Sequence, residues 1–257
     1  MLTLRRGRYL ARLATGAQDL DRALMLRARG FGRGAGVSDR DAYDAICHQI
    51  LVEHAVTGDL VGCFRLLPLR SGMAIGDSYA AQHYDLTALS TRAGPMLELG
   101  RFCIAPEHRD PDILRLAWGA ITALVDAGGV EVLFGCSSFA GVRPDTYRDA
   151  FGVLRARHLA PDASAPRIKS PDVVRFATDL SHAAIDPRRA VQQMPPLLRT
   201  YLAMGGWVSD HAVIDRDLGT LHVFTGLEIG AIPAARARAL RAIAAGRQDA
   251  RRSVEAG

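Results

Sequence analysis

Residues 96–138 read as a strand, a helix and a second strand, and this succession constrains the fold more than any other part of the sequence. "MLELGRFCI" is an apolar run of strand length, and a proline-rich turn follows it. An amphipathic helix is expected from Asp112, a suitable N-cap, to about Ala127, with Gly128 and Gly129 as its stop. "VEVLFGCSSF" then predicts a further strand.

The upstream sequence adds strands on the same plan. "RYLARLA" predicts a first strand, "GAQDLDRALMLRARGF" a helix, and "GRGAGVSDR" a glycine-rich loop. Two apolar runs, residues 47–55 and 60–67, flank a short polar turn and predict a hairpin. A mixed sheet covered by helices is the economical way to bury such a series of elements.

The downstream sequence is less regular. Residues 144–160 read as helical, and residues 161–194 are rich in proline and aspartate. We interpret the whole segment, about 139–194, as an insertion or lid. "PPLLRTYLAMGG" predicts a short helix, and "WVSDHAVID" with "TLHVFTGLEI" predicts a closing hairpin. Residues 231–257 are an Ala/Arg-rich basic tail, either helical or disordered.

Bulk composition limits the class of protein. The chain has 257 residues, 49% of them hydrophobic and 23% charged, as in ordinary globular proteins. It has no apolar run of about 18 residues and no signal-peptide pattern, so we expect a cytoplasmic protein. The charge of +5, carried by arginines apart from Lys169, is typical of a base-composition bias but favours anionic partners; no motif indicates nucleic acid.

The four cysteines do not form a metal or disulfide pattern. Cys47, Cys63, Cys103 and Cys136 lack a CxxC pair and a histidine at zinc-ligand spacing. The sequence therefore predicts reduced, buried thiols and no metal. A thiol-based transferase would need Cys103 or Cys136 beside a histidine base, and no such partner is evident.

Two charges interrupt the apolar strand at 96–104. Alternation would place Glu98 and Arg101 on opposite faces, but Gly100 between them indicates a bulge that would bring both toward one side. A structural ion pair at a strand end is the alternative.

Further polar residues precede this strand. Arg27 and Phe31 share a helix face, Asp41 and Asp44 lie three residues apart, and Arg65 interrupts an apolar strand. Singly, each reads as a cap or a surface charge; together they form a constellation.

In order and spacing, this constellation and "ELGRF" resemble the polar signature of acyl-homoserine-lactone synthases. The chain is more similar to the L-ornithine N-alpha-acyltransferases of ornithine lipid biosynthesis, through "YAAQHYDL", "LELGRFCI", "LFGCSSF", "PPLLRTYLAMGGWV" and "HAVIDRDLGTLHVF". The resemblance spans about residues 20–230. It implies a GNAT-like α/β domain over 1–230, with a mixed central sheet, flanking helices and the insertion before the C-terminal hairpin.

The resemblance also implies a reaction: transfer of a 3-hydroxyacyl chain from acyl carrier protein to the alpha-amine of L-ornithine, giving lyso-ornithine lipid. A thioester is already activated, so no protein nucleophile is needed. Glu98 is the candidate that receives the proton of the amine or orients the ammonium. Arg101 is the candidate that positions this carboxylate or binds the phosphate of the carrier.

The implied substrate-binding set is Arg27, Phe31, Asp41, Asp44 and Arg65. The aspartates offer carboxylates to the two cationic nitrogens of ornithine, and Arg65 or Arg27 can hold its carboxylate.

The donor site departs from the acyl-CoA pattern of the superfamily. "APEHRDPDI" lacks the glycines that would cradle a pyrophosphate, so the carrier-bound phosphopantetheine is the expected donor and no bound cofactor is expected. Strands 96–104 and 131–138, with Ser137 and Ser138, would receive its arm. Arg109 and Arg115 are candidates for docking the acidic carrier protein.

Other functions stay open at this point. One alternative is acyl-homoserine-lactone synthesis or acylation of another amino acid. An alternative of another class is a non-catalytic module that binds acyl carrier protein or a membrane. The apolar and basic N-terminus and the basic tail allow peripheral contact with the anionic inner face of a membrane.

Overall fold

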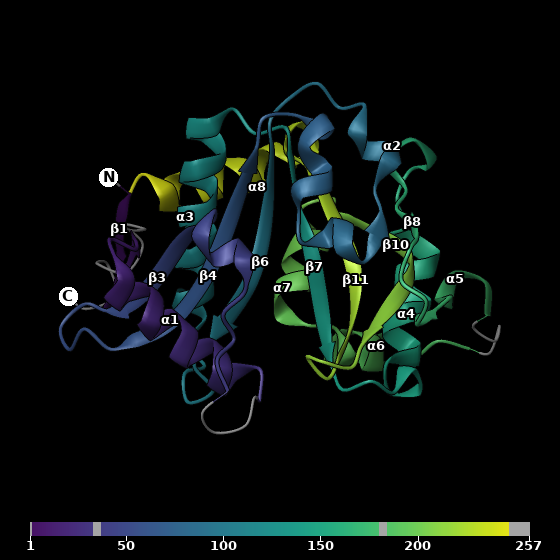
Figure 1. The fold of residues 1–257 in the computed structure, drawn as a ribbon, viewed down its shortest axis with the longest axis horizontal. Helices are drawn as coiled ribbons and strands as arrows, with labels where there is room; N and C mark the ends of the chain where they lie inside the picture. The colour runs from purple at the N-terminus through teal and green to yellow at the C-terminus, as the bar shows by residue number, and fades with distance from the viewer. Residues whose placement is uncertain (1, 33–36, 180–183, 247–257) are drawn as a thin grey trace, which may run out of the picture. The chain divides into compact units, whose positions relative to one another are not determined.

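The computed structural model describes residues 2–32, 37–179 and 184–246, which form two compact units (Figure 1). Of the described residues, those within 1–65, 101–128 and 234–257 form the first unit, and those within 66–100 and 129–233 form the second. Residues 33–36 of the predicted glycine-rich loop and 247–257 of the predicted tail lie outside the described residues.

The first unit contains an antiparallel sheet. Strands β1 (Thr3–Arg6), β2 (Tyr9–Leu13) and β3 (His48–His54) follow one another in the sheet, and β4 (Leu60–Leu69) lies next to β3. The hairpin predicted at 47–67 is therefore confirmed. Strand β1 was not predicted: its four residues pair with β2 from Thr3 opposite Arg12 to Arg6 opposite Tyr9, although none of them is buried.

Helices α1 (Ala17–Gly30) and α3 (Pro111–Gly128) belong to this unit. Ala23 and Leu26 of α1 pack with Leu51 of β3 and with the buried thiols Cys63 and Cys103. The apolar residues at helical spacing that predicted α1 thus form the face that this helix buries.

Helix α3 begins and ends close to its predicted limits, but its cap is different. The Oδ1 atom of Asp110 accepts the backbone N–H of Asp112 at 2.9 Å, so Asp110 caps the helix and Asp112 lies in its first turn. The prediction of Asp112 as the cap is wrong by two residues because Pro111 occupies the first helical position. Gly129, with φ of 57°, ends the helix as expected.

Part of the predicted basic tail is a helix that packs on α3. In α8 (Ala234–Ala244), Ile243 lies so close to Gly119 that an added β-carbon would come within 2.5 Å of it. Arg241 binds Asp126 through two hydrogen bonds of 2.9 Å. Both helices belong to the first unit.

The second unit contains the mixed part of the sheet. Its strand order is β6, β7, β11, β10 and β9, where β6 (Met96–Ile104) and β7 (Val132–Ala140) pair in parallel. The hairpin of β10 (Trp207–Asp215) and β11 (Thr220–Glu228) is antiparallel, as are the pairs β7 with β11 and β10 with β9 (Val173–Val174). The mixed sheet and the closing hairpin are confirmed.

The segment predicted as an insertion contributes to the core of the second unit. Its helices are α4 (Arg148–Arg157), α5 (Phe176–Asp179) and α6 (Pro187–Gln193), and α7 (Pro196–Ala203) follows them. Phe151 and Phe176 stack with ring centroids 5.0 Å apart, in one cluster with Leu221 and Val223 of β11. These residues are therefore part of a packed core, and the domain boundaries stay a prediction.

The second unit is completed by short elements. The stretch between β4 and β6 holds the 3₁₀ turns η2 (Gly72–Asp77) and η3 (Ala80–Gln82), strand β5 (Tyr84–Asp85) and helix α2 (Thr87–Ser90). Strand β5 pairs with β8 (Arg167–Ile168). Among the described residues, no helix is both long enough and apolar enough to cross a membrane.

Candidate active site

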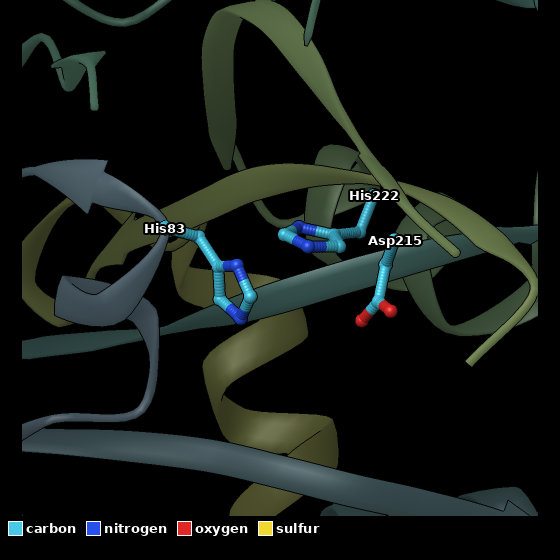
Figure 2. A group of neighbouring side chains, drawn as sticks. All are labelled: His83, Asp215 and His222. Atoms are coloured by element: carbon cyan, nitrogen blue, oxygen red, sulfur yellow. The ribbon is translucent and has the colours of Figure 1, made fainter. Parts of the chain in front are cut away.

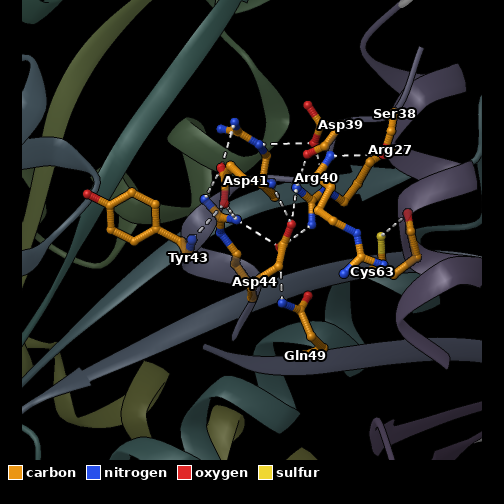
Figure 3. A network of polar contacts seen from close by, with 12 residues as sticks. Arg27, Ser38, Asp39, Arg40, Asp41, Tyr43, Asp44, Gln49 and Cys63 are labelled. Atoms are coloured by element: carbon orange, nitrogen blue, oxygen red, sulfur yellow. Dashed lines mark hydrogen bonds and ion pairs between the residues drawn. The ribbon is translucent and has the colours of Figure 1, made fainter. Parts of the chain in front are cut away.

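A cluster of three arginines and three aspartates, four of them buried and two partly exposed, lies in the first unit (Figure 3). We call it the arginine–aspartate cluster; its members are Arg27, Asp39, Asp41, Asp44, Arg65 and Arg101. Helix α1, the turn η1 (Ala42–Ala45) with the residues before it, β4 and β6 supply these side chains. Five of the six were predicted as site residues, and the structure brings those five together.

Arg27 is the centre of this cluster and is 1% exposed. Its Nε donates to Asp39 Oδ2 at 2.7 Å, and its Nη1 donates to Asp44 Oδ1 at 2.6 Å. Burial by itself would raise the pKa of Asp44, but the hydrogen bonds from Arg27, the Asp41 backbone N–H and Arg65, together with the charge of Arg27, outweigh it, so the pKa lies below its ordinary value. The carboxyl group of Asp44 is therefore ionised at neutral pH.

Arg65 joins Asp44 to Asp41. Its Nη1 lies 2.8 Å from Asp44 Oδ1, and its Nη2 donates to Asp41 Oδ2 at 2.8 Å. Asp41 and Asp44 also form a capping box at the start of η1, which explains their spacing of three. The two aspartates thus hold both the backbone of the turn η1 and the side chain of Arg65 in place.

Arg101 is the outer arginine, with a side chain 10% exposed. It donates from Nε to Asp39 and from Nη2 to Asp41, each at 3.1 Å, and its guanidinium lies 6.0 Å from the ring centre of Phe31. Its φ of 50° is in the left-handed region, which is costly for a residue with a side chain. The bulge was predicted at Gly100, and the unusual backbone is one residue later.

Glu98 lies in the second unit and is held by a different kind of contact. This carboxylate is 4% exposed, and its two oxygens accept the backbone N–H groups of Tyr79 at 2.9 Å and Ala80 at 2.7 Å. Both donors are at the start of η3. Two N–H dipoles directed at one carboxylate stabilise its negative charge inside the protein; we call this arrangement the Glu98 cradle.

Tyr201 of α7 is a further buried polar group of this unit. Burial first, and then the charge of Glu98, raise the pKa of Tyr201 above its usual value, so its hydroxyl keeps its proton at neutral pH. It is 2% exposed. Tyr201 and the Glu98 cradle belong to the same unit, and the charge of Glu98 acts on the Tyr201 hydroxyl.

Strands β6 and β7 are in register from Met96 opposite Val132 to Leu99 opposite Gly135. A β-carbon on Gly135 would lie 2.2 Å from the carbonyl oxygen of Leu99, so this approach requires glycine. Beyond it, Ser137 is buried and accepts a hydrogen bond from Thr225, whereas Ser138 is exposed. The predicted role of the two serines in binding the phosphopantetheine arm of the acyl donor stays a prediction.

The start of α3 carries the predicted docking arginines. Arg109 and Arg115 are both exposed, and Arg115 donates to Asp112 at 2.9 Å. Asp112 also accepts from Arg6, and Asp110 from Arg8. Carboxylates thus occupy the end of α3 where a pyrophosphate would otherwise bind.

The thiols do not suit nucleophilic catalysis. Burial raises the pKa of Cys103 to about 11 and raises that of Cys63 further above its usual value, so both stay protonated at neutral pH. All four cysteines are free, and Cys47 and Cys136 are half-buried. The prediction of buried thiols is right for two of the four.

Sequence reasoning missed three parts of the site. Asp39, two residues before Asp41, was not selected, although it accepts hydrogen bonds from two arginines. Gln49, which donates to Asp44 at 3.2 Å, was missed as well. The backbone donors of the Glu98 cradle leave no signal in side-chain identities, so no motif could have indicated them.

Comparison with known proteins places this geometry in a class. Residues 26–119 match the family model of the acetyltransferase (GNAT) domain, a range that contains all six residues of the arginine–aspartate cluster and Glu98. Among solved structures, the loading GNATL domain of CurA from Lyngbya majuscula is 15% identical, with a TM-score of 0.48 over 86% of this chain and 98% of that one. Together with the curated relatives described next, the match to this family model defines the chain as an acyltransferase with a GNAT-like fold.

Curated relatives define the family more closely. The chain is 32% identical to the L-ornithine N(alpha)-acyltransferase of Rhizobium meliloti (strain 1021) over 86% of this chain and 80% of that protein. It is 31% identical to the L-ornithine N(alpha)-acyltransferase of Rhodobacter capsulatus over 84% of this chain and 88% of that protein. It belongs to the family of L-ornithine N(alpha)-acyltransferases.

Proposed function

We propose that this enzyme transfers a 3-hydroxyacyl chain from acyl carrier protein to the alpha-amine of L-ornithine and so forms lyso-ornithine lipid. The observation that carries the proposal is the similarity over more than four-fifths of the chain to relatives that are named for acylation of ornithine at this nitrogen. The acyl donor and the lipid product go beyond those names and rest on the chemistry of the residues.

The proposed reaction forms an amide and breaks a thioester. The neutral amine attacks the thioester carbonyl, the C–N bond forms, and the C–S bond breaks to leave the thiol of the carrier. In this scheme Glu98 receives the proton of the amine, directly or through one water. The two backbone N–H groups that hold Glu98 support this role because they fix the carboxylate without using a mobile side chain.

A buried, protonated hydroxyl in the same unit as this carboxylate offers a proton for the departing thiolate. Tyr201 keeps its proton at neutral pH because burial and Glu98 raise its pKa. In the proposed scheme it donates this proton to the sulfur and recovers one from the ammonium through Glu98. The proton lost by the amine then replaces the proton given to the sulfur, and the proposed steps use no metal or cofactor.

For the ornithine site, we propose that the less buried members of the arginine–aspartate cluster contact the substrate. The Asp41 side chain is 25% exposed and suits a cationic nitrogen of ornithine, and Arg101 suits its carboxylate. Arg27, Asp44 and Arg65 are almost fully buried and act as positioning residues. Phe31, under the guanidinium of Arg101, holds that side chain in place.

For the donor, the carboxylates at the start of α3 support a carrier-bound phosphopantetheine. Asp110 caps the helix, where acyl-CoA enzymes place the pyrophosphate on free N–H groups, and a second negative charge there would be repelled. The exposed Arg109 and Arg115 are proposed to meet the acidic carrier protein. Ser137 and Ser138 on β7 are proposed to bind the amide arm.

A competition assay tests the proposal. Purified enzyme is incubated with 3-hydroxyacyl carrier protein, or with the equivalent acyl-CoA, and with ornithine, lysine, glutamine or S-adenosylmethionine, and the products are measured by mass spectrometry. We expect acylation of ornithine at the alpha-nitrogen and much slower reaction with the equivalent acyl-CoA. A lactone formed from S-adenosylmethionine, without any acyl-ornithine, would show instead the chemistry of acyl-homoserine-lactone synthases.

A further inference from the structure

We propose that His83, Asp215 and His222 form a binding site for one divalent transition-metal ion in the second unit. One ligand atom from each side chain can be chosen so that all three lie within 4.8 Å of one another (Figure 2). His222 is 2% exposed. The sequence predicted no metal, and the acyl-transfer scheme uses none of the three residues.

The register of the closing hairpin explains how two of the ligands meet. His222 on β11 lies opposite Val213 on β10, and Asp215 is two residues beyond Val213. Because side chains alternate along a strand, Asp215 and His222 project from the same face of the hairpin. Leu221 and Val223 occupy the other face, in the packed core of the unit.

His83 approaches that face from another segment. It follows η3 and immediately precedes β5, and its ring meets the ring of His222 edge to face with centroids 4.9 Å apart. Figure 2 shows both rings and the carboxylate of Asp215 directed toward a common space. Three side chains from two distant parts of the sequence thus converge.

Tyr84 determines which nitrogen of His222 can bind a metal. The Tyr84 hydroxyl lies 2.8 Å from the carbonyl oxygen of His222, to which it can only donate, and 3.1 Å from His222 Nδ1. Because a carbonyl oxygen can only accept, the single hydroxyl proton of Tyr84 is donated to the carbonyl of His222. It then accepts from Nδ1–H, which leaves the lone pair of His222 on Nε2.

This donor set suits a first-row divalent ion. Two imidazoles and one carboxylate are the ligands that zinc takes when a fourth position is left for water or a small ligand. Ligand atoms at about 2.1 Å from a tetrahedral zinc lie roughly 3.4 Å apart, so side-chain rotations that bring the ligand atoms closer by at most about 1.4 Å would complete the site. The alternative is a hydrogen-bonded group without an ion.

Metal binding here would affect the Glu98 cradle. Tyr79 and Ala80, which hold Glu98, lie four and three residues before His83, respectively, and the ring centroids of Tyr79 and His83 are 5.1 Å apart. An ion on His83 would tie this turn to the β10–β11 hairpin. Because only the folded state presents all three ligands together, the ion should also stabilise the fold.

Zinc binding to the full-length, tag-free enzyme tests the site. The protein is stripped with a chelator and dialysed against Zn²⁺, and bound zinc is measured by mass spectrometry together with the thermal unfolding temperature. His83→Gln and Asp215→Asn each remove one ligand; the second keeps an oxygen that can accept the N–H of Leu218, as Asp215 does at 2.8 Å. His48→Gln, at an exposed position on β3, is the matched control.

We expect about one zinc per chain in the wild type and the control, a higher unfolding temperature with zinc, and affinity at least about tenfold weaker in both ligand variants. Cobalt in place of zinc should give the visible absorption of tetrahedral coordination, and that absorption should be lost in both variants. Equal zinc binding by the wild type and the folded ligand variants, or no binding by the wild type, would overturn the proposal and leave a hydrogen-bonded cluster.

Discussion

The arginine–aspartate cluster and the Glu98 cradle both bury negative charge, but they neutralise it differently. In the cluster, Asp39 and Asp44 are balanced by the cationic side chains of Arg27 and Arg65. In the cradle, Glu98 is held by two backbone N–H groups. A single substitution can therefore uncover a buried charge in the cluster, whereas the donors of the cradle persist whatever the side chains are.

Removal of Arg27 should have the largest effect on stability. Arg27→Leu leaves Asp39 and Asp44 buried without their central cation, and we expect a loss of about 3–5 kcal/mol in the free energy of unfolding. Urea unfolding measures it. Arg40→Ala, which breaks an exposed pair with Asp21, is the control and should cost at most about 1 kcal/mol. Similar values for both variants would contradict the account of the cluster.

The Glu98 cradle can be disturbed through β7, the strand that packs against β6. Gly135→Ala puts a β-carbon against the carbonyl of Leu99, next to Glu98 on β6, and should cost about 1–3 kcal/mol together with activity. Gly76→Ala, where nothing lies within 4 Å of the added carbon, is the matched control. If both variants unfold at the same denaturant concentration, the close approach of β6 and β7 is not required.

Acid should weaken charge pairs that rest on side chains. The hydrogen bond from Arg12 holds the pKa of Asp19 below its ordinary value of 3.8, so the contribution of this pair is present above that pH and is lost as the pH falls below it. The difference in unfolding free energy between wild type and Asp19→Asn should therefore shrink from about pH 5 to about pH 2. A difference that stays constant with pH would contradict this sign.

The smallest effect on stability is expected at the docking arginines. Arg115→Ala removes an exposed side chain paired with Asp112 and should change the unfolding free energy by less than about 0.5 kcal/mol. If Arg115 meets the carrier protein, the KM for acyl carrier protein should rise at low salt and approach the wild-type value at high salt. An unchanged KM at low salt would remove Arg115 from the docking surface.

Apolar runs of strand length predicted the hairpins and the mixed sheet, and apolar residues at helical spacing predicted helices α1, α3 and α7. Burial of one face leaves such a periodic signal in the sequence. Strand β1 was missed because it is a half-exposed edge strand in which arginines break the pattern. The order and spacing of the polar residues predicted five of the six members of the arginine–aspartate cluster. They did not predict the sixth member, Asp39, or its neighbour in the network, Gln49. Backbone donors, such as those to Glu98, and ligands from distant segments, such as His83 and His222, are visible only after folding.

The role of Glu98 in acyl transfer is tested most directly by steady-state kinetics of Glu98→Gln with 3-hydroxyacyl carrier protein and ornithine. The account predicts a fall in kcat of about 10²–10⁴-fold, with little change in the KM for the donor and an unfolded fraction no greater than in the wild type. Glu107→Gln, at an exposed carboxylate of the first unit, should keep the wild-type rate. A folded Glu98→Gln enzyme with a kcat within about twofold of the wild type would contradict the account, because Glu98 would then not be the group that receives the proton.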